Sequence, residues 1–343
     1  MKKSLLIAIT ACSFFFSANN HAQATVWVVN SGGIGDFTNA QDAITAATAG
    51  DTLYFVGSPV SYGNFTVTKP LTLIGPGYFL NENPNAYVNK YSPQIGTITI
   101  ESDNPTDGTR DLNSGAAGTR LIGIQSTYLT VRVNNVTVDR CKIYYLQGQG
   151  NDTVIPANIT VTRSYVEGYI SDVINSTFEN TIFPPYGQAM YDVEGCLIKN
   201  CDLGYVYTAE ALNSIFLNCR FYYSNEILHF QDANNVRHCV FNNADPSANA
   251  EYTAGTNNIF SVPEASFYID PQPTALDAKK QLHATSPGIG AGEGGVNVGA
   301  FGGASPYVLS GIPPIPAVYE ITAPSAVNAP DGLPVTIKVR ANN

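Results

Sequence analysis

Asn200-Cys201-Asp202-Leu203 and Asn218-Cys219-Arg220-Phe221 are two copies of a short string that recurs through the middle of the chain. The second residue of each string is taken as an anchor, and successive anchors lie about twenty residues apart. The other four copies are Arg140-Cys141-Lys142-Ile143, Arg163-Ser164-Tyr165-Val166, Asn180-Thr181-Ile182-Phe183 and His238-Cys239-Val240-Phe241. A repeat of this length is typical of a solenoid, in which each repeat packs against its neighbours.

An apolar residue stands three positions before every anchor, and polar and apolar residues alternate around it. These apolar residues are Val138, Val161, Phe178, Ile198, Phe216 and Val236. Alternation with a period of two predicts strands, and no helical period accompanies it. Because a strand repeat of about twenty residues cannot bury its apolar face alone, the sequence predicts an all-β fold of stacked parallel coils, about 4.8 Å apart.

Equivalent side chains of stacked coils should form ladders. The anchors place Cys141, Cys201, Cys219 and Cys239 in one inward position, and Asn180 and its equivalents in the bend before it. Asn suits a bend because it tolerates the left-handed backbone conformation. Cysteines on neighbouring coils should have Cβ atoms about 4.8 Å apart, beyond the usual disulfide separation, so we expect buried free thiols.

Charged residues follow the same register on the outside of the coils. Glu179 and Lys199 should be neighbours two positions before the anchor, and Asp202 and Arg220 one position after it. We expect both to be surface ion pairs, which contribute about 0–1 kcal/mol each.

A short helix precedes the first coils and should cover the open end of the solenoid. Thr38 and Gln41 fit a capping box, alanines and Ile44 follow, and Gly50 ends the helix. The helix at 37–50, the Asn and Cys ladders and the glycine-rich strings at 286–292 and 298–303 together resemble the pectin-lyase-like superfamily. This resemblance implies a right-handed parallel β-helix with an N-terminal capping helix over most of residues 25–303. The chain also resembles secreted β-helix proteins of Bacteroidetes-type bacteria.

The first 24 residues read as a signal peptide. Lys2 and Lys3 precede an apolar run, and Ala22-Gln23-Ala24 fits a cleavage site after Ala24. A second interpretation is that Ile9-Thr10-Ala11-Cys12 is a bacterial lipobox with a lipid on Cys12. Either interpretation places the protein outside the cytoplasm: secreted, periplasmic or on the outer cell surface.

The end of the chain differs from the repeat. We expect the β-helix domain to span 25–305 and to be followed at 306–343 by a Pro/Gly-rich linker and a two-strand tail. The tail is too short to be an independent domain, so it should dock on the β-helix.

Composition excludes several classes of function. The net charge of −10 leaves no basic surface for nucleic acid, and no segment after the leader could cross a membrane. The glycine-rich string at 290–295 has no βαβ setting and is not a nucleotide site.

One acidic column is the candidate metal site. Counting nine residues back from three anchors gives Asp172, Asp192 and Glu210, and Asp232 falls close by on the next coil. Carboxylates about 5 Å apart either raise each other's pKa or recruit a cation, so these four residues are candidate calcium ligands. The resemblance agrees, because β-helix pectate lyases carry acidic calcium ligands on one face. The alternative is an ordinary solvated edge.

Tyrosines surround this column and offer aromatic faces to sugar rings. The candidate substrate-binding residues are Tyr191, Tyr205, Tyr207 and Tyr223. We therefore expect a non-catalytic protein that binds or displays toward polysaccharide. The alternatives are a polysaccharide lyase or glycoside hydrolase that uses the acidic column, and a structural or adhesive rod. No catalytic residue is identified.

Overall fold

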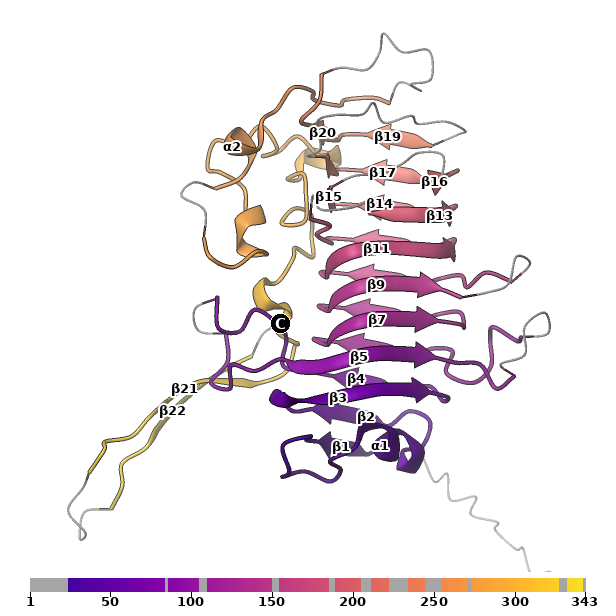
Figure 1. The fold of residues 1–343 in the computed structure, drawn as a ribbon. Helices are drawn as coiled ribbons and strands as arrows, with labels where there is room; N and C mark the ends of the chain where they lie inside the picture. The colour runs from indigo at the N-terminus through magenta and orange to yellow at the C-terminus, as the bar shows by residue number, and fades with distance from the viewer. Residues whose placement is uncertain are drawn as a thin grey trace, which may run out of the picture.

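The computed structural model describes residues 24–83, 86–104, 110–149, 154–184, 189–204, 211–221, 234–244, 255–269, 273–326 and 332–341. The chain forms a right-handed parallel β-helix of about eight turns, with strands stacked along one axis (Figure 1). None of the helices in this described part is long and apolar enough to cross a membrane.

Two long parallel sheets run the length of the solenoid. The ten-stranded sheet contains, in order, β1 Val26–Val29, β2 Thr52–Phe55, β4 Thr72–Ile74, β6 Arg120–Ile122, β8 Thr137–Asp139, β10 Thr160–Thr162, β12 Thr177–Glu179, β14 Leu197–Lys199, β17 Ile215–Leu217 and β19 Asn235–Arg237. The seven-stranded sheet contains β3 Ser58–Val67, β5 Pro93–Ile100, β7 Gln125–Val131, β9 Lys142–Gly148, β11 Tyr165–Ile174, β13 Met190–Glu194 and β16 Ala211–Leu212. A three-stranded sheet joins β15 Asp202–Leu203, β18 Arg220–Phe221 and β20 Val240–Phe241.

The strand register matches the repeat in the sequence. Val138, Val161, Phe178, Ile198, Phe216 and Val236 pair from strand to strand, and all are fully buried in the solenoid interior. The cysteine ladder is confirmed: Cys141, Cys201, Cys219 and Cys239 are free thiols with no exposed surface, and Cys196 is free and buried as well.

The bend before each anchor is left-handed in all six coils. The φ values there lie between 48° and 57°, in Arg140, Arg163, Asn180, Asn200, Asn218 and His238. The Asn amides make a contact that the repeat does not predict. The Asn180 amide donates to the Ala300 and Gly302 carbonyls at 2.8 and 2.7 Å, outside the coils.

These carbonyls belong to a C-terminal strap, defined here as residues 255–316, that returns along the solenoid from the last coils toward the first (Figure 1). It contains the short helix α2 Glu264–Phe267 and the 3-10 helices η3 Ala278–Lys280, η4 Glu293–Gly295 and η5 Leu309–Gly311. The strap buries Asp202 and Arg220 completely, so the expectation of a surface ion pair there is wrong. Asp202 instead accepts from Tyr268 Oη at 2.7 Å, and Arg220 donates to the Val262 carbonyl at 2.7 Å. The other expected pair is confirmed, with Lys199 Nζ 2.8 Å from Glu179 Oε1 at the surface.

The N-terminal helix α1 spans Ala40–Ala46 and buries Ala40, Ala43 and Ile44 against the first coil. The expected Thr38/Gln41 capping box is wrong, because Asn39 is the N-cap and accepts from the Asp42 amide. Gln41 pairs with the backbone of Thr66 on β3, accepting at 2.8 Å and donating at 3.2 Å. The helix therefore satisfies part of the open strand edge as well as covering the core.

The two expected tail strands form an antiparallel hairpin, β21 Ala317–Thr322 and β22 Thr336–Arg340. Its base contacts the loop beside the first coils: the Val88 amide donates to the Val318 carbonyl, and Ala317 packs near Leu80 and Ala86. The rest of the hairpin extends away from the solenoid (Figure 1).

Candidate functional site

Three of the eight predicted site residues lie in the described part of the chain. Asp172 is on β11, and Tyr191 and Asp192 are on the adjacent strand β13. The other five lie outside the described residues: Glu210, Asp232, Tyr205, Tyr207 and Tyr223.

Asp172 and Asp192 occupy equivalent positions on neighbouring coils. Ser171 pairs with Tyr191 and Val173 with Val193, which leaves the two aspartates side by side in the register. Both have positive φ, 57° and 46°, so they form a second bend column, which Asp tolerates better than most residues. Asp172 is half-buried and accepts from Ser171 Oγ at 2.6 Å, and Asp192 is exposed. The left-handed backbone conformation by itself therefore favours Asp or Asn at both positions.

The calcium hypothesis depends on residues that are not described. Within the described ranges, no three acidic, His or Cys side chains gather closely enough to hold a metal ion. Two carboxylates are fewer than calcium usually takes from a protein. The four-residue calcium site stays a prediction that needs Glu210 and Asp232.

Tyr191 is one end of a tyrosine ladder, defined here as Tyr128, Tyr145, Tyr169 and Tyr191, on the outer face of the seven-stranded sheet. The rings come from the successive strands β7, β9, β11 and β13, and neighbouring centroids lie 5.1, 4.4 and 4.9 Å apart. The rings are tilted or edge-on to one another rather than flat-stacked.

The coils hold the ladder in place through register, space and one hydrogen bond. Tyr128, Tyr145 and Tyr169 are direct partners across the strands. Gly168 makes room for the second ring, because a Cβ there would lie 2.6 Å from the Tyr145 ring. Gln147 donates to Tyr169 Oη at 2.8 Å and fixes the orientation of that phenol.

Solvent reaches this face. Tyr128 is 39% exposed, and Tyr144, whose ring lies edge-on to Tyr145 at 4.4 Å, is 40% exposed. In Figure 1 the strap lies beside the seven-stranded sheet rather than across β7, β9 and β11. The pKa of Tyr145 is raised, first by its hydrogen bond with Tyr144, so the Tyr145 phenol stays neutral at physiological pH. The result is an aromatic surface that carries phenol hydroxyl groups.

The sequence analysis missed Tyr128, Tyr145 and Tyr169. Tyr145 stands four residues after its anchor and Tyr169 stands five after its own, because β11 shifts register between Val166 and Tyr169. A count at constant offset therefore does not align them. A search for aromatic residues recurring at about the coil spacing would have found the ladder.

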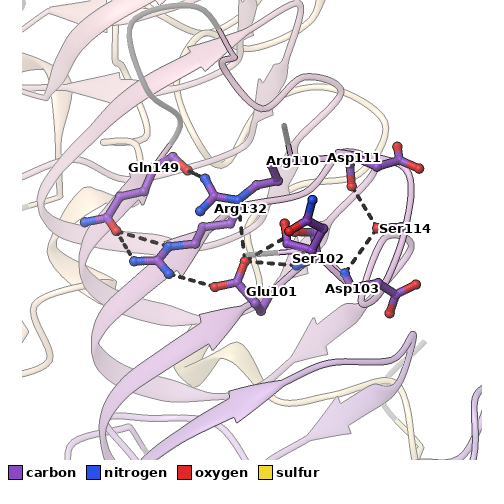
Figure 2. Close-up of polar contacts among 9 residues, drawn as sticks. Glu101, Ser102, Asp103, Arg110, Asp111, Ser114, Arg132 and Gln149 are labelled. Atoms are coloured by element: carbon purple, nitrogen blue, oxygen red, sulfur yellow. Dashed lines mark hydrogen bonds and ion pairs between the residues drawn. The ribbon is translucent and has the colours of Figure 1, made fainter. Parts of the chain in front are cut away.

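A second polar cluster lies where β5, β7 and β9 end (Figure 2). Arg132 Nη1 lies 2.7 Å from Glu101 Oε2, and its other nitrogens donate to Gln149 Oε1. Arg110 donates to the Gln149 carbonyl at 2.9 Å, with its Nε 3.6 Å from Glu101 Oε1. Because Glu101 and Arg110 are buried and pair within the cluster, we interpret it as a latch for the loop after β5.

Comparison of the chain with protein-family models, with curated proteins and with solved structures found no match. The functional argument therefore rests on the site itself.

Proposed function

We propose that this is a secreted or surface-exposed protein that binds polysaccharide along the tyrosine ladder. The observation that carries the proposal is four tyrosine rings in contact across four successive strands, on a face that solvent reaches. Aromatic rings present an apolar face with a polar rim, which suits the apolar faces and hydroxyl edges of sugar rings. The signal peptide predicted for residues 1–24 supports export.

The direction of the ladder favours a chain-like ligand. Successive rings are separated by the strand spacing, so the aromatic surface runs along the solenoid axis instead of enclosing a pocket. An extended glycan can contact several rings at once, and the summed contacts offset the weakness of each one.

We further infer that the chain is a divergent member of the pectin-lyase-like superfamily, of the kind found in Bacteroidetes-type bacteria. The capping helix, the left-handed Asn column and the buried Cys ladder support this inference. A lyase or hydrolase using the acidic column is the second hypothesis, and a plain adhesive rod is the third. Binding is preferred because the ladder supports recognition without any acid–base pair.

The test is a panel of neutral and acidic polysaccharides, with binding measured by affinity electrophoresis and calorimetry. Tyr145→Ala should weaken binding at least about tenfold, which corresponds to about 1.4 kcal/mol. Gly168→Ala should have a similar effect, because the new methyl group would lie 2.6 Å from both the Tyr145 ring and the Tyr144 carbonyl oxygen and would displace both. Tyr91→Ala is the matched control, since Tyr91 is 55% exposed and is not part of the ladder.

The same samples separate the three hypotheses. The appearance of new reducing or unsaturated chain ends in the wild type, but not in Asp192→Asn, would show that the protein cleaves polysaccharide and does not only bind it. Binding that survives both Tyr145→Ala and Gly168→Ala would contradict the assignment to the ladder. An absence of binding across the panel would leave the rod as the surviving hypothesis.

A further inference from the structure

We propose that the C-terminal hairpin is a self-association arm, through which two copies of this chain pair by the apolar faces of their hairpins. This proposal does not depend on polysaccharide binding, because the hairpin shares no residue with the tyrosine ladder.

The two faces of the hairpin differ in chemistry. Direct pairs across the strands put Val318 with Val339 and Ile321 with Ile337 on one face. Val335 and Leu333 continue the same alternation in the residues before β22. The opposite face carries the pairs Glu320 with Lys338 and Thr322 with Thr336.

The apolar face is uncovered in the single chain. Ile321, Leu333, Val335, Ile337 and Val339 are each between 49% and 57% exposed. The solenoid does not cover them, because the hairpin leaves it after Ala317 (Figure 1). A two-stranded ribbon is marginally stable in water by itself, and several large aliphatic side chains on one face mark a contact surface.

Charge identifies a second copy as the partner. Charged residues of the polar face make contacts within the hairpin: Glu320 Oε2 lies 2.9 Å from Lys338 Nζ, and the Arg340 guanidinium lies over the Tyr319 ring. Among the described residues of the hairpin, the apolar face carries no charge with which to select a charged partner. An uncharged, self-complementary face can meet its own copy about a two-fold axis, where each residue repeats its contact.

The charge distribution of the whole chain agrees with this choice. The net charge is −10, yet residues 317–340 contain two acidic and two basic side chains and carry none of it. The arm is a part of this acidic molecule at which two copies can meet without like-charge repulsion. Salt should strengthen pairing, because it screens repulsion between the two solenoids while leaving an apolar contact intact.

The experiment measures the mass of the full chain by sedimentation velocity and light scattering across concentration and salt. The wild type should form a dimer that tightens as salt increases. Ile337→Lys should be monomeric at the same concentrations, since it places a charge on the apolar face at an already exposed position. Thr336→Lys is the matched control, one residue away on the polar face, and should remain dimeric.

Two variants, each with one added cysteine, report the contact between hairpins directly. In a Cys12→Ser background, the remaining cysteines are buried and should not cross-link. Ile337→Cys should form an intermolecular disulfide under mild oxidation, and Thr336→Cys should not. A monomeric wild type, equal loss of dimer in both lysine variants, or binding of the monomer to neutral lipid vesicles through Ile337 would overturn the proposal.

Discussion

Asp202 is a carboxyl group that has lost all of its exposed surface to the strap. Burial raises its pKa from 3.8 to about 6, against the opposing effects of hydrogen bonds from Tyr268 Oη and the Ala300 amide. Because the folded state holds this proton more tightly than the unfolded state, the stability from protonation is fully present below about pH 3.8. It is lost as the pH rises through 6.

Asp202→Asn should remove this pH dependence. An amide accepts from Ala300 and donates to a rotated Tyr268 hydroxyl, so the variant keeps both contacts without a charge. Its free energy of unfolding relative to wild type should rise by up to about 3 kcal/mol between pH 4 and pH 7. Chemical denaturation across that range measures it, with exposed Asp103→Asn as the control. A constant difference at every pH would contradict a raised pKa for Asp202.

Cys219 tests the packing inside the coils. Its thiol lies within 3.4 Å of the carbonyls of Ile198 and Leu217, and burial raises its pKa. Cys219→Leu should overpack the interior and cost about 1–3 kcal/mol by denaturant unfolding, and Cys219→Ala should cost less. Ellman titration should detect the buried thiols only after unfolding. Fast reaction in the native protein would show that the ladder is open.

At the residue level, the sequence predicted the side-chain environments that every coil repeats and missed the contacts that occur in only one coil. The cysteine position and the apolar column were predictable because every coil repeats their environment. The burial of Asp202 was not, because its partners Tyr268 and Ala300 lie 66 and 98 residues away and belong to a segment without repeats. Asp202 and Arg220 look like an outward pair until that segment is placed over them.

Among the structural elements, the bends combine a conformational and a bonding role. Asn180 has a φ of 52°, and its buried amide donates twice to the strap. Asn213 has a φ of 49° at an exposed bend, and its side-chain amide donates a hydrogen bond to Glu194 Oε1 at 3.0 Å. The two positions therefore share a backbone conformation and differ in burial, which separates the two roles.

Asn180→Gly should keep the left-handed bend and lose the two strap hydrogen bonds, at a cost of about 1–3 kcal/mol. Asn180→Ala should cost about 1–2 kcal/mol more, because it also strains the bend. Asn213→Gly should be close to neutral. Thermal and urea unfolding of the three variants gives the order. Equal effects of Asn180→Gly and Asn213→Gly would mean that the strap contacts contribute nothing.

The candidate site was predictable only where the coils stay in register. Asp172 and Asp192 keep the same offset of nine residues from their anchors and lie side by side as expected, and Tyr191 was found because it directly precedes Asp192. The rest of the ladder was missed because its residues do not keep one offset: β11 shifts register before Tyr169, and Tyr191 pairs with Ser171 rather than with Tyr169. Such shifts hide from a residue count a surface that is continuous in space.

At the scale of the whole molecule, the strap connects coils that are otherwise linked only to their neighbours. It contacts the last coils through Ile259 and Val262 and reaches the first coils through a buried polar hub at Asp277. Asp277 accepts from the Ser310 amide at 2.7 Å and from Asn83 Nδ2 at 3.0 Å. A solenoid without such a connection unfolds in pieces, because each repeat is stabilised mainly by its neighbours.

Asp277→Ala should uncouple the strap from the solenoid. The change leaves several buried donors without their acceptor and should cost about 3 kcal/mol. In the wild type, hydrogen exchange of strap and coil amides should open with one shared free energy of unfolding. In the variant, amides at 273–312 should exchange earlier, while those of β7, β9 and β11 keep most of their protection. Glu293→Ala, at the exposed ion pair with Arg237, is the control and should leave the two segments coupled. If Asp277→Ala lowers protection equally in strap and coils, Asp277 supports the core as a whole and does not anchor the strap.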